Sequence, residues 1–163
     1  MILVLLGTQN NSFHRLLEEI EKNVENENIQ EEVVVQAGYT KFEPQTKKQQ
    51  IKLFTTIPKK ALDSLIEQAN IVISHGGVGS MITANQKRKK VIAVPRLKKY
   101  HEHVNDHQVE TIEIFAKRGY VLPVKKVEEL GDALKQIYNF QPTIYQKDKN
   151  SNILGIIEEF IGK

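Results

Sequence analysis

The sequence predicts an α/β fold, a doubly wound, Rossmann-like parallel sheet, and three observations lead to that prediction. Short aliphatic runs alternate along the chain with longer segments whose apolar residues recur at helical spacing. Glycine-rich turns follow two of these runs, at Gly7 and at Gly76-Gly77. No internal repeat or low-complexity tract divides the 163 residues, so we expect a single domain over residues 1–163. Alternating strands and helices are joined by right-handed crossovers, which make the sheet parallel.

The predicted strands are the short aliphatic runs, several of them rich in valine and isoleucine. They cover residues 2–6, 32–36, 51–55, 71–74, 91–94 and 120–122. In a doubly wound sheet with the strand order 3-2-1-4-5-6, strands one and four are neighbours, and the winding direction reverses between them. We therefore expect a ligand site beyond the carboxyl ends of these two strands.

The predicted helices carry their apolar residues on one face. In residues 13–24 these residues repeat from Leu16 to Val24, and Ser12 stands where an N-cap is expected. Pro58 is expected in the first turn of the next helix, where proline is tolerated. Further helices are predicted at about residues 80–87, 104–117, 127–138 and 152–161, with long loops at 38–50 and 141–151. The last of these helices is expected either to pack on its own domain or to contact a partner.

The composition excludes several classes of protein. The chain has no cysteine, which rules out a disulfide framework and a cysteine-ligated metal site. Its apolar opening stops at Gly7, which is too short for a signal sequence or a membrane span. The net charge of +3 and pI of about 9.0 suit an anionic ligand or an anionic membrane surface. With no signal sequence or membrane span in this opening, we expect a cytoplasmic protein. No motif typical of nucleic-acid recognition is present, so we expect that the protein does not bind nucleic acid.

The segment from His75 to Ser80, His-Gly-Gly-Val-Gly-Ser, is the most informative stretch. Its glycines, Gly76, Gly77 and Gly79, permit a sharp turn and a close approach of the main chain to a ligand. The helix predicted to begin near Ser80 presents unpaired N–H groups and the positive end of its dipole, which suits a diphosphate. Ser80 is expected either to cap this helix or to donate its hydroxyl to a phosphate. The alternative is a tight strand–helix turn that holds no ligand.

Two further segments are expected at the same edge of the sheet. Gly7-Thr8-Gln9 follows the first strand and forms a second glycine loop. A polar loop and helix start follow the fifth strand, and there Glu102, Asp106 and Gln108 have the oxygen and nitrogen atoms that bind sugar hydroxyl groups. An ordinary polar helix start is the alternative for this last segment.

Other kinds of site fit the sequence less well. A dinucleotide-binding loop needs a third glycine and follows the first strand, whereas the Gly77-Val78-Gly79 turn follows the fourth. A Walker phosphate loop and a nucleophile elbow are absent. His101, His103 and His107 could ligate a metal, but no complete ligand set is evident. We therefore expect no bound metal.

Together these motifs resemble the C-terminal domain of the family-28 glycosyltransferases. The resemblance covers nearly the whole chain and is greatest with short, stand-alone members. These include the catalytic subunit of the two-part UDP-N-acetylglucosamine transferase of lipid-linked oligosaccharide synthesis, and bacterial subunits that work in pairs on capsule or exopolysaccharide repeat units. The segments that carry it are His75–Ser80, Val91-Ile92-Ala93-Val94-Pro95-Arg96, Asn105-Asp106-His107-Gln108, Gly7-Thr8-Gln9 and Gln36-Ala37-Gly38.

The resemblance implies the C-terminal half of a GT-B fold, with a UDP-sugar as substrate and no cofactor. It implies that residues 75–80 line the diphosphate, that residues 106–108 reach the donor sugar or ribose, and that residues 55–57 lie against the base. His101 and His103 have no counterpart in the family pattern, which leaves the donor sugar open. The expected nucleotide-sugar-binding residues are Gly7, Thr8, Gln9, His75, Gly76, Gly77, Gly79, Ser80, Glu102, Asp106, His107 and Gln108.

The resemblance also implies an inverting transfer to a lipid-linked saccharide. No aspartate of the chain forms an Asp-x-Asp motif, so we expect binding without a metal. The general base and the acceptor site are expected on a second, membrane-associated glycosyltransferase subunit, which would hold this chain at the inner face of the membrane. The alternatives are a non-catalytic accessory subunit that enhances a partner transferase, and an epimerase acting on UDP-N-acetylglucosamine.

Overall fold

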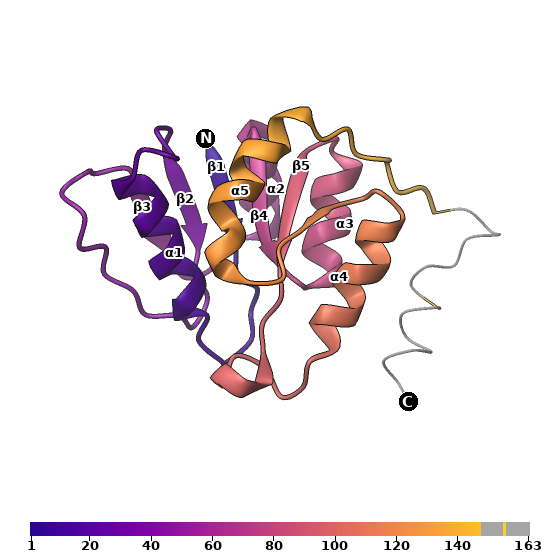
Figure 1. Cartoon of the computed structure of the whole chain (residues 1–163), viewed down its shortest axis with the longest axis horizontal. Helices are drawn as coiled ribbons and strands as arrows, with labels where there is room; N and C mark the ends of the chain where they lie inside the picture. Colours follow the sequence, from indigo (N-terminus) through magenta and orange to yellow (C-terminus); the bar gives the residue numbers. More distant parts are fainter. Residues whose placement is uncertain (148–154, 156–163) are drawn as a thin grey trace.

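A computed structural model describes residues 1–147 and Gly155. One sheet lies between two layers of helices (Figure 1). The strands are β1 (Ile2–Leu5), β2 (Val33–Gln36), β3 (Ile51–Phe54), β4 (Ile71–His75), β5 (Lys90–Val94) and β6 (Leu122–Pro123). The helices are α1 (His14–Glu25), α2 (Lys59–Gln68), α3 (Val78–Gln86), α4 (His107–Lys117) and α5 (Leu130–Gln136), with short 3-10 turns η1 (Lys98–Tyr100), η2 (Val127–Glu129) and η3 (Ile137–Asn139).

All neighbouring strands are parallel, and their order is β3-β2-β1-β4-β5-β6. This confirms the predicted doubly wound, Rossmann-like sheet. Strand β1 has β2 on one side and β4 on the other, and Leu5 lies opposite both Gln36 and Ser74. The loops that follow β1, β2 and β4 therefore leave the same edge of the sheet close together.

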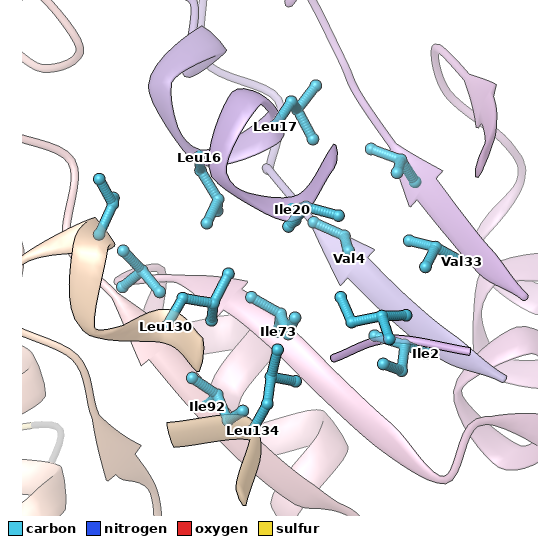
Figure 2. Close-up of a cluster of buried hydrophobic side chains, with 14 of the residues drawn as sticks. Ile2, Val4, Leu16, Leu17, Ile20, Val33, Ile73, Ile92, Leu130 and Leu134 are labelled. Carbon is cyan, nitrogen blue, oxygen red and sulfur yellow. The ribbon is translucent and has the colours of Figure 1, made fainter. Parts of the chain in front are cut away.

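One face of the sheet packs against α1 and α5 (Figure 2). Alternate residues of each strand point to this face, and those between them point to the other. Both faces of the sheet are covered, which explains why the strands are nearly continuous aliphatic runs. The side chains labelled in Figure 2 are Ile2, Val4, Leu16, Leu17, Ile20, Val33, Ile73, Ile92, Leu130 and Leu134.

The other face packs against α2, α3 and α4. These helices contribute buried apolar residues, among them Ile66, Met81 and Phe115. The chain after η3 returns to this face, where Oδ1 of the buried Asn85 accepts a hydrogen bond from the Tyr145 amide at 2.6 Å. The helices flanking β4 are thus fixed by packing, and α3 is held with its first turn at the carboxyl edge of the sheet.

Several predicted helix starts differ from the structure. Phe13, not Ser12, occupies the N-cap of α1, and no side chain caps this helix. Pro58 is the N-cap of α2 and not its first helical residue. The helix predicted from residue 104 begins only at His107, because Oδ1 of Asn105 accepts a hydrogen bond from the His107 amide at 3.0 Å and so ends the preceding loop.

The remaining predictions concern loops and the end of the chain. Residues 38–50 contain no helix or strand, as predicted, and neither do residues 141–147. The helix predicted at residues 152–161 lies outside the described residues, apart from Gly155. Within the described ranges, none of the helices has the length and apolar character needed to cross a membrane.

Candidate functional site

The glycine loops after β1 and β4 lie beside each other and border a cavity of about 300 Å³. The cavity lies beyond the carboxyl ends of the strands, at the point where the winding direction reverses, as predicted. The last residue of β2, the loop before α2 and the first turn of α2 complete its lining. The lining residues are Gly7, Thr8, Gln9, Gln36, Thr56, Ile57, Leu62, His75, Gly77, Gly79 and Ser80.

Three other hollows are larger, with volumes of about 450, 640 and 420 Å³. The first lies between α4 and the segment around Pro123, and the second lies beside the ends of β2 and β3, around Tyr39. The third lies between the last turns of α1 and residues 45–48. The second and third border no helix N-terminus, and the first reaches the first turn of α4 only at Val109, whose amide already donates to the Asp106 carbonyl at 3.1 Å. The smaller cavity is therefore the one suited to an anionic group, since unpaired backbone N–H groups and a helix dipole meet there.

His75 ends β4, and its imidazole lies between the two glycine loops with only 5% of the residue exposed. A Cβ atom on Gly7 would lie 2.5 Å from Nε2 of the ring, and one on Gly77 would lie 2.6 Å from it. Gly7 also has a φ of +77°, which favours glycine. These two glycines were predicted to allow the main chain to approach a ligand, but they are required first to accommodate the imidazole.

The side-chain amide of Gln108 joins the ends of β4 and β5 behind His75. Its Oε1 accepts hydrogen bonds from the backbone amides of Gly76 at 3.1 Å and Arg96 at 3.0 Å, and its Nε2 lies 3.0 Å from His75 Nδ1. Neither Gly76 nor Gln108 lines the cavity. The Gly76 amide, predicted to line a diphosphate, and the Gln108 amide, predicted to reach a sugar, are thus bonded to each other within the protein.

His75 is neutral in the folded protein. Its pKa is lowered from 6.5 to about 3, mainly by burial and also by the nearby Arg96 guanidinium and His103, against the opposing effect of the Gln108 hydrogen bond. A neutral ring has one N–H donor and one acceptor nitrogen. The chemistry of the cavity therefore depends on which nitrogen carries the proton.

The neutral state of His75 predicts that the fold loses stability as the pH falls. The native pKa is lowered, so below pH 6.5 the unfolded chain binds a proton that the native state does not, and stability decreases as the pH falls from 6.5 toward 3. By about pH 5 the loss is expected to reach about 2 kcal/mol. Urea unfolding at neutral and acidic pH measures it. The loss should be smaller by that amount in His75→Gln, and an equal loss in both proteins would contradict the assignment.

Helix α3 begins at Val78, with Gly77 as its N-cap, two residues before the predicted start at residue 80. Its first backbone bond runs from the Met81 amide to the Gly77 carbonyl at 3.2 Å. The amides of residues 78–80 precede that bond and have no intrahelical acceptor. Gly79 and Ser80 both line the cavity. Ser80 lies in the first turn of α3 and does not cap the helix, because Gly77 occupies the N-cap and no side chain bonds to it there.

Gln36 lines the cavity but was not among the predicted site residues. Its Oε1 accepts a hydrogen bond from the Gly7 amide at 3.1 Å, and its Nε2 donates to the carbonyls of Gly7 at 2.9 Å and Thr55 at 3.2 Å. It thereby holds the glycine loop after β1 to the neighbouring strand. The available signal was a polar residue at the end of an otherwise all-valine strand. Thr56 and Ile57, expected against a base, do line the cavity.

Glu102 was expected to bind sugar hydroxyl groups, but it lies outside the cavity and is only 2% exposed. Arg15 holds its carboxylate through two hydrogen bonds, Nε to Oε2 at 3.0 Å and Nη2 to Oε1 at 2.9 Å. The Leu97 amide donates to Oε1 at 3.0 Å. The carboxylate is therefore engaged within the protein and fixes the loop after β5 against α1.

Arg96 is a buried cation that joins three loops behind the cavity. It is 1% exposed, and its Nη atoms donate to the carbonyls of Leu6, Asn11 and Glu102. Its guanidinium also lies 5.2 Å from the centre of the Phe13 ring. Burial lowers the pKa of Arg96 to about 10, while Glu102 raises it, and the group remains charged at neutral pH. Its Nε has no partner among the described residues.

The other predicted residues lie around the cavity and not in it. Asp106 is exposed, and its Oδ1 accepts a hydrogen bond from the Lys98 amide at 2.8 Å. His107 is the first residue of α4, and neither of these residues lines the cavity. His103 contacts Gln9, with 2.9 Å between the two Nε2 atoms, and burial lowers its pKa. Among residues 1–147 there is no group of three or more histidine, aspartate or glutamate side chains placed to hold a metal ion.

Comparisons with known proteins agree on the kind of domain. The model of the glycosyltransferase family 28 C-terminal domain matches residues 1–160. Similar solved structures include MurG of Acinetobacter baumannii, with 16% identity and a TM-score of 0.60 over 85% of this chain and 40% of that one. The calicheamicin glycosyltransferase CalG4 has 16% identity and a TM-score of 0.60, over 83% of this chain and 34% of that one. The glycotransferase of kitacinnamycin has 13% identity and a TM-score of 0.58, over 99% of this chain and 37% of that one. This chain thus spans 34 to 40% of these structures. No curated protein sequence matches it.

Proposed function

Because this chain belongs to glycosyltransferase family 28 as a C-terminal domain, with the Rossmann-like fold of that half of a GT-B enzyme, we propose that its cavity binds the diphosphate of a UDP-sugar. The observation that carries the proposal is the meeting of two features in one cavity. The free amides of the first turn of α3 border it, and so does the imidazole of His75. Both suit an anionic group, as does the net charge of +3.

The sugar is transferred, on this proposal, without a metal ion. Negative charge develops on the leaving diphosphate, and N–H groups already fixed in the fold stabilise it without rearranging during the reaction. Gly79 and Ser80 contribute such groups at the start of α3, and Gln36 and Gln108 hold the surrounding loops in place. The absence of an Asp-x-Asp motif from the sequence supports this part of the proposal.

The general base for the acceptor hydroxyl comes from a second domain, which we place on a partner polypeptide. Among the described residues that line the cavity there is no carboxylate, and His75 is the one titratable side chain. A base must be able to hold a proton near the working pH, and His75, with a pKa of about 3, is unsuited to this task. The partner we propose is a membrane-associated subunit that binds a lipid-linked saccharide. Full transfer activity of this chain by itself would refute that part.

Calorimetric titration of the purified chain with UDP, and then with a panel of UDP-sugars, tests the donor site. We expect binding of UDP with an affinity that EDTA does not change. A loss of affinity with EDTA would contradict the metal-free site, and the absence of any UDP binding would contradict the donor site itself. The second result would favour a non-catalytic accessory subunit.

A further inference from the structure

The hydrogen bonds of Gln108 fix the proton position on His75. The backbone amides of Gly76 and Arg96 can only donate, so the atom of Gln108 that faces both of them must be its oxygen. The amide nitrogen of Gln108 then faces His75 Nδ1 at 3.0 Å, and this nitrogen can only donate. Nδ1 is therefore the acceptor, and the single proton of the neutral ring lies on Nε2.

The protonated nitrogen points toward the cavity. Nε2 lies 2.5 Å from the Cβ position of Gly7, nearer than any other ring atom, and it lies 2.6 Å from that of Gly77, as does Cε1. Both glycines line the cavity together with His75. Within residues 1–147, no hydrogen bond occupies Nε2, and this atom is not sealed from the cavity. A histidine that is 5% exposed thus presents an unused N–H donor where a ligand would lie.

We propose that Gln108 is a positioning residue that holds His75 as the neutral Nε2–H tautomer, so that the ring donates a hydrogen bond to an anionic oxygen of the bound diphosphate. The identity of this ligand rests on the proposed function. Rotation of the Gln108 amide would turn its NH₂ group against two backbone N–H groups, and protonation of Nδ1 would turn N–H against NH₂. Each of these alternatives places donors against donors, which explains why a single tautomer persists.

The surroundings of His75 favour the neutral donor over an imidazolium. The charged or titratable groups that face it are Arg96, which follows β5, and His103 in the loop before α4, and both disfavour a second proton. The residues after β1, Gly7-Thr8-Gln9, include no titratable side chain. An ordinary histidine ceases to be a cation above its usual pKa, whereas this donor keeps its proton at neutral and alkaline pH. The donor strength of the site is thereby made independent of pH near neutrality.

Nuclear magnetic resonance tests the tautomer directly on the ligand-free chain. Long-range correlations between ring protons and ring nitrogens distinguish the two neutral forms and the imidazolium, and the His75 signals are identified by their loss in His75→Gln. We expect the Nε2–H form from alkaline pH down to about pH 5, with no titration near the usual value of about 6.5. A proton on Nδ1, or an ordinary titration, overturns the proposal whether or not UDP binds.

The variant Gln108→Glu tests the positioning role. Its carboxylate still accepts from the two backbone amides, but its second oxygen requires a proton on Nδ1, which leaves Nε2 unprotonated in the neutral ring. We expect the Nδ1–H form or an imidazolium in the spectrum. We also expect the UDP dissociation constant to rise about tenfold relative to the unmodified chain at alkaline pH, and that ratio to shrink toward about pH 6 as an imidazolium regains the Nε2 proton.

Comparison of Gln108→Glu with the unmodified chain at each pH cancels the effect of the titration of UDP itself on the dissociation constant. The matched control is Gln68→Glu, which makes the same change of charge at an exposed position at the end of α2, and we expect it to bind UDP as the unmodified chain does. A dissociation-constant ratio for Gln108→Glu that is constant with pH would show that the carboxylate acts through charge or folding, and would overturn the positioning role. If neither the unmodified chain nor Gln108→Glu binds UDP, the donor-site proposal fails, and the magnetic resonance spectrum of the ligand-free chain still decides the tautomer of His75.

Discussion

Replacement of Gly79 by valine is expected to abolish UDP binding and to leave the fold intact. A Cβ atom at this position meets no other atom within 4 Å, so the protein itself has room for a side chain. That room is the cavity, because Gly79 lies in the first turn of α3 and lines it. The valine would occupy the space of a phosphate group and would displace it from the free amides. With the loss of two charge-assisted hydrogen bonds, the dissociation constant should rise by about 100-fold or more.

The matched control is Thr83→Val, which places the same side chain one helical turn further along α3 at a position that does not line the cavity. Calorimetry with UDP measures the affinity, and thermal unfolding measures the stability. Gly79→Val should unfold at or slightly above the temperature of the unmodified chain, because valine has the higher helix propensity. Retention of UDP affinity in Gly79→Val would place the diphosphate elsewhere.

Replacement of Arg96 by leucine is expected to produce the largest loss of stability. The guanidinium donates to the carbonyls of Leu6, Asn11 and Glu102, and a leucine would leave these groups without that donor inside the protein. It would also remove the buried cation beside the Glu102 carboxylate. We expect the free energy of unfolding to fall by about 3–5 kcal/mol.

Urea unfolding followed by circular dichroism measures this change. Arg118→Leu serves as the control, because Arg118 is exposed at the end of α4 and its replacement should change the free energy of unfolding by less than about 0.5 kcal/mol. A loss of less than about 1 kcal/mol in Arg96→Leu would show that the loops behind the cavity are held mainly by other contacts.

The fold was predictable because its signals are local. The aliphatic runs that form β1 and β4 are short and continuous, the segments between strands have helical periodicity, and chirality then leaves few possible arrangements. The strand order and the position of the cavity followed from these rules. The helix starts were less accurate, because the preferences of Ser12 and Pro58 for the start of a helix do not fix its first residue to within one position.

The part of the site that the sequence did not predict depends on contacts between distant residues. Glu102 and Gln108 were singled out for the hydrogen bonds that their side chains can form with sugars, and those capacities are real. The structure shows that Arg15 and the Leu97 amide take up the first, and that the amides of Gly76 and Arg96 take up the second. A sequence shows what a side chain can bind, but not which neighbour reaches it first.

The anchoring of the two glycine loops by Gln36 and Gln108 has a consequence for how fast a ligand is captured. Gln36 bonds the loop after β1 to the end of β2, and Gln108 bonds the ends of β4 and β5 to the start of α4, each through both its oxygen and its nitrogen. A loop held by such bonds gives up little conformational entropy when the diphosphate arrives. The association rate should therefore be limited by collision and by electrostatic attraction, so that it falls with rising ionic strength, and not by a slow closing motion of the loops.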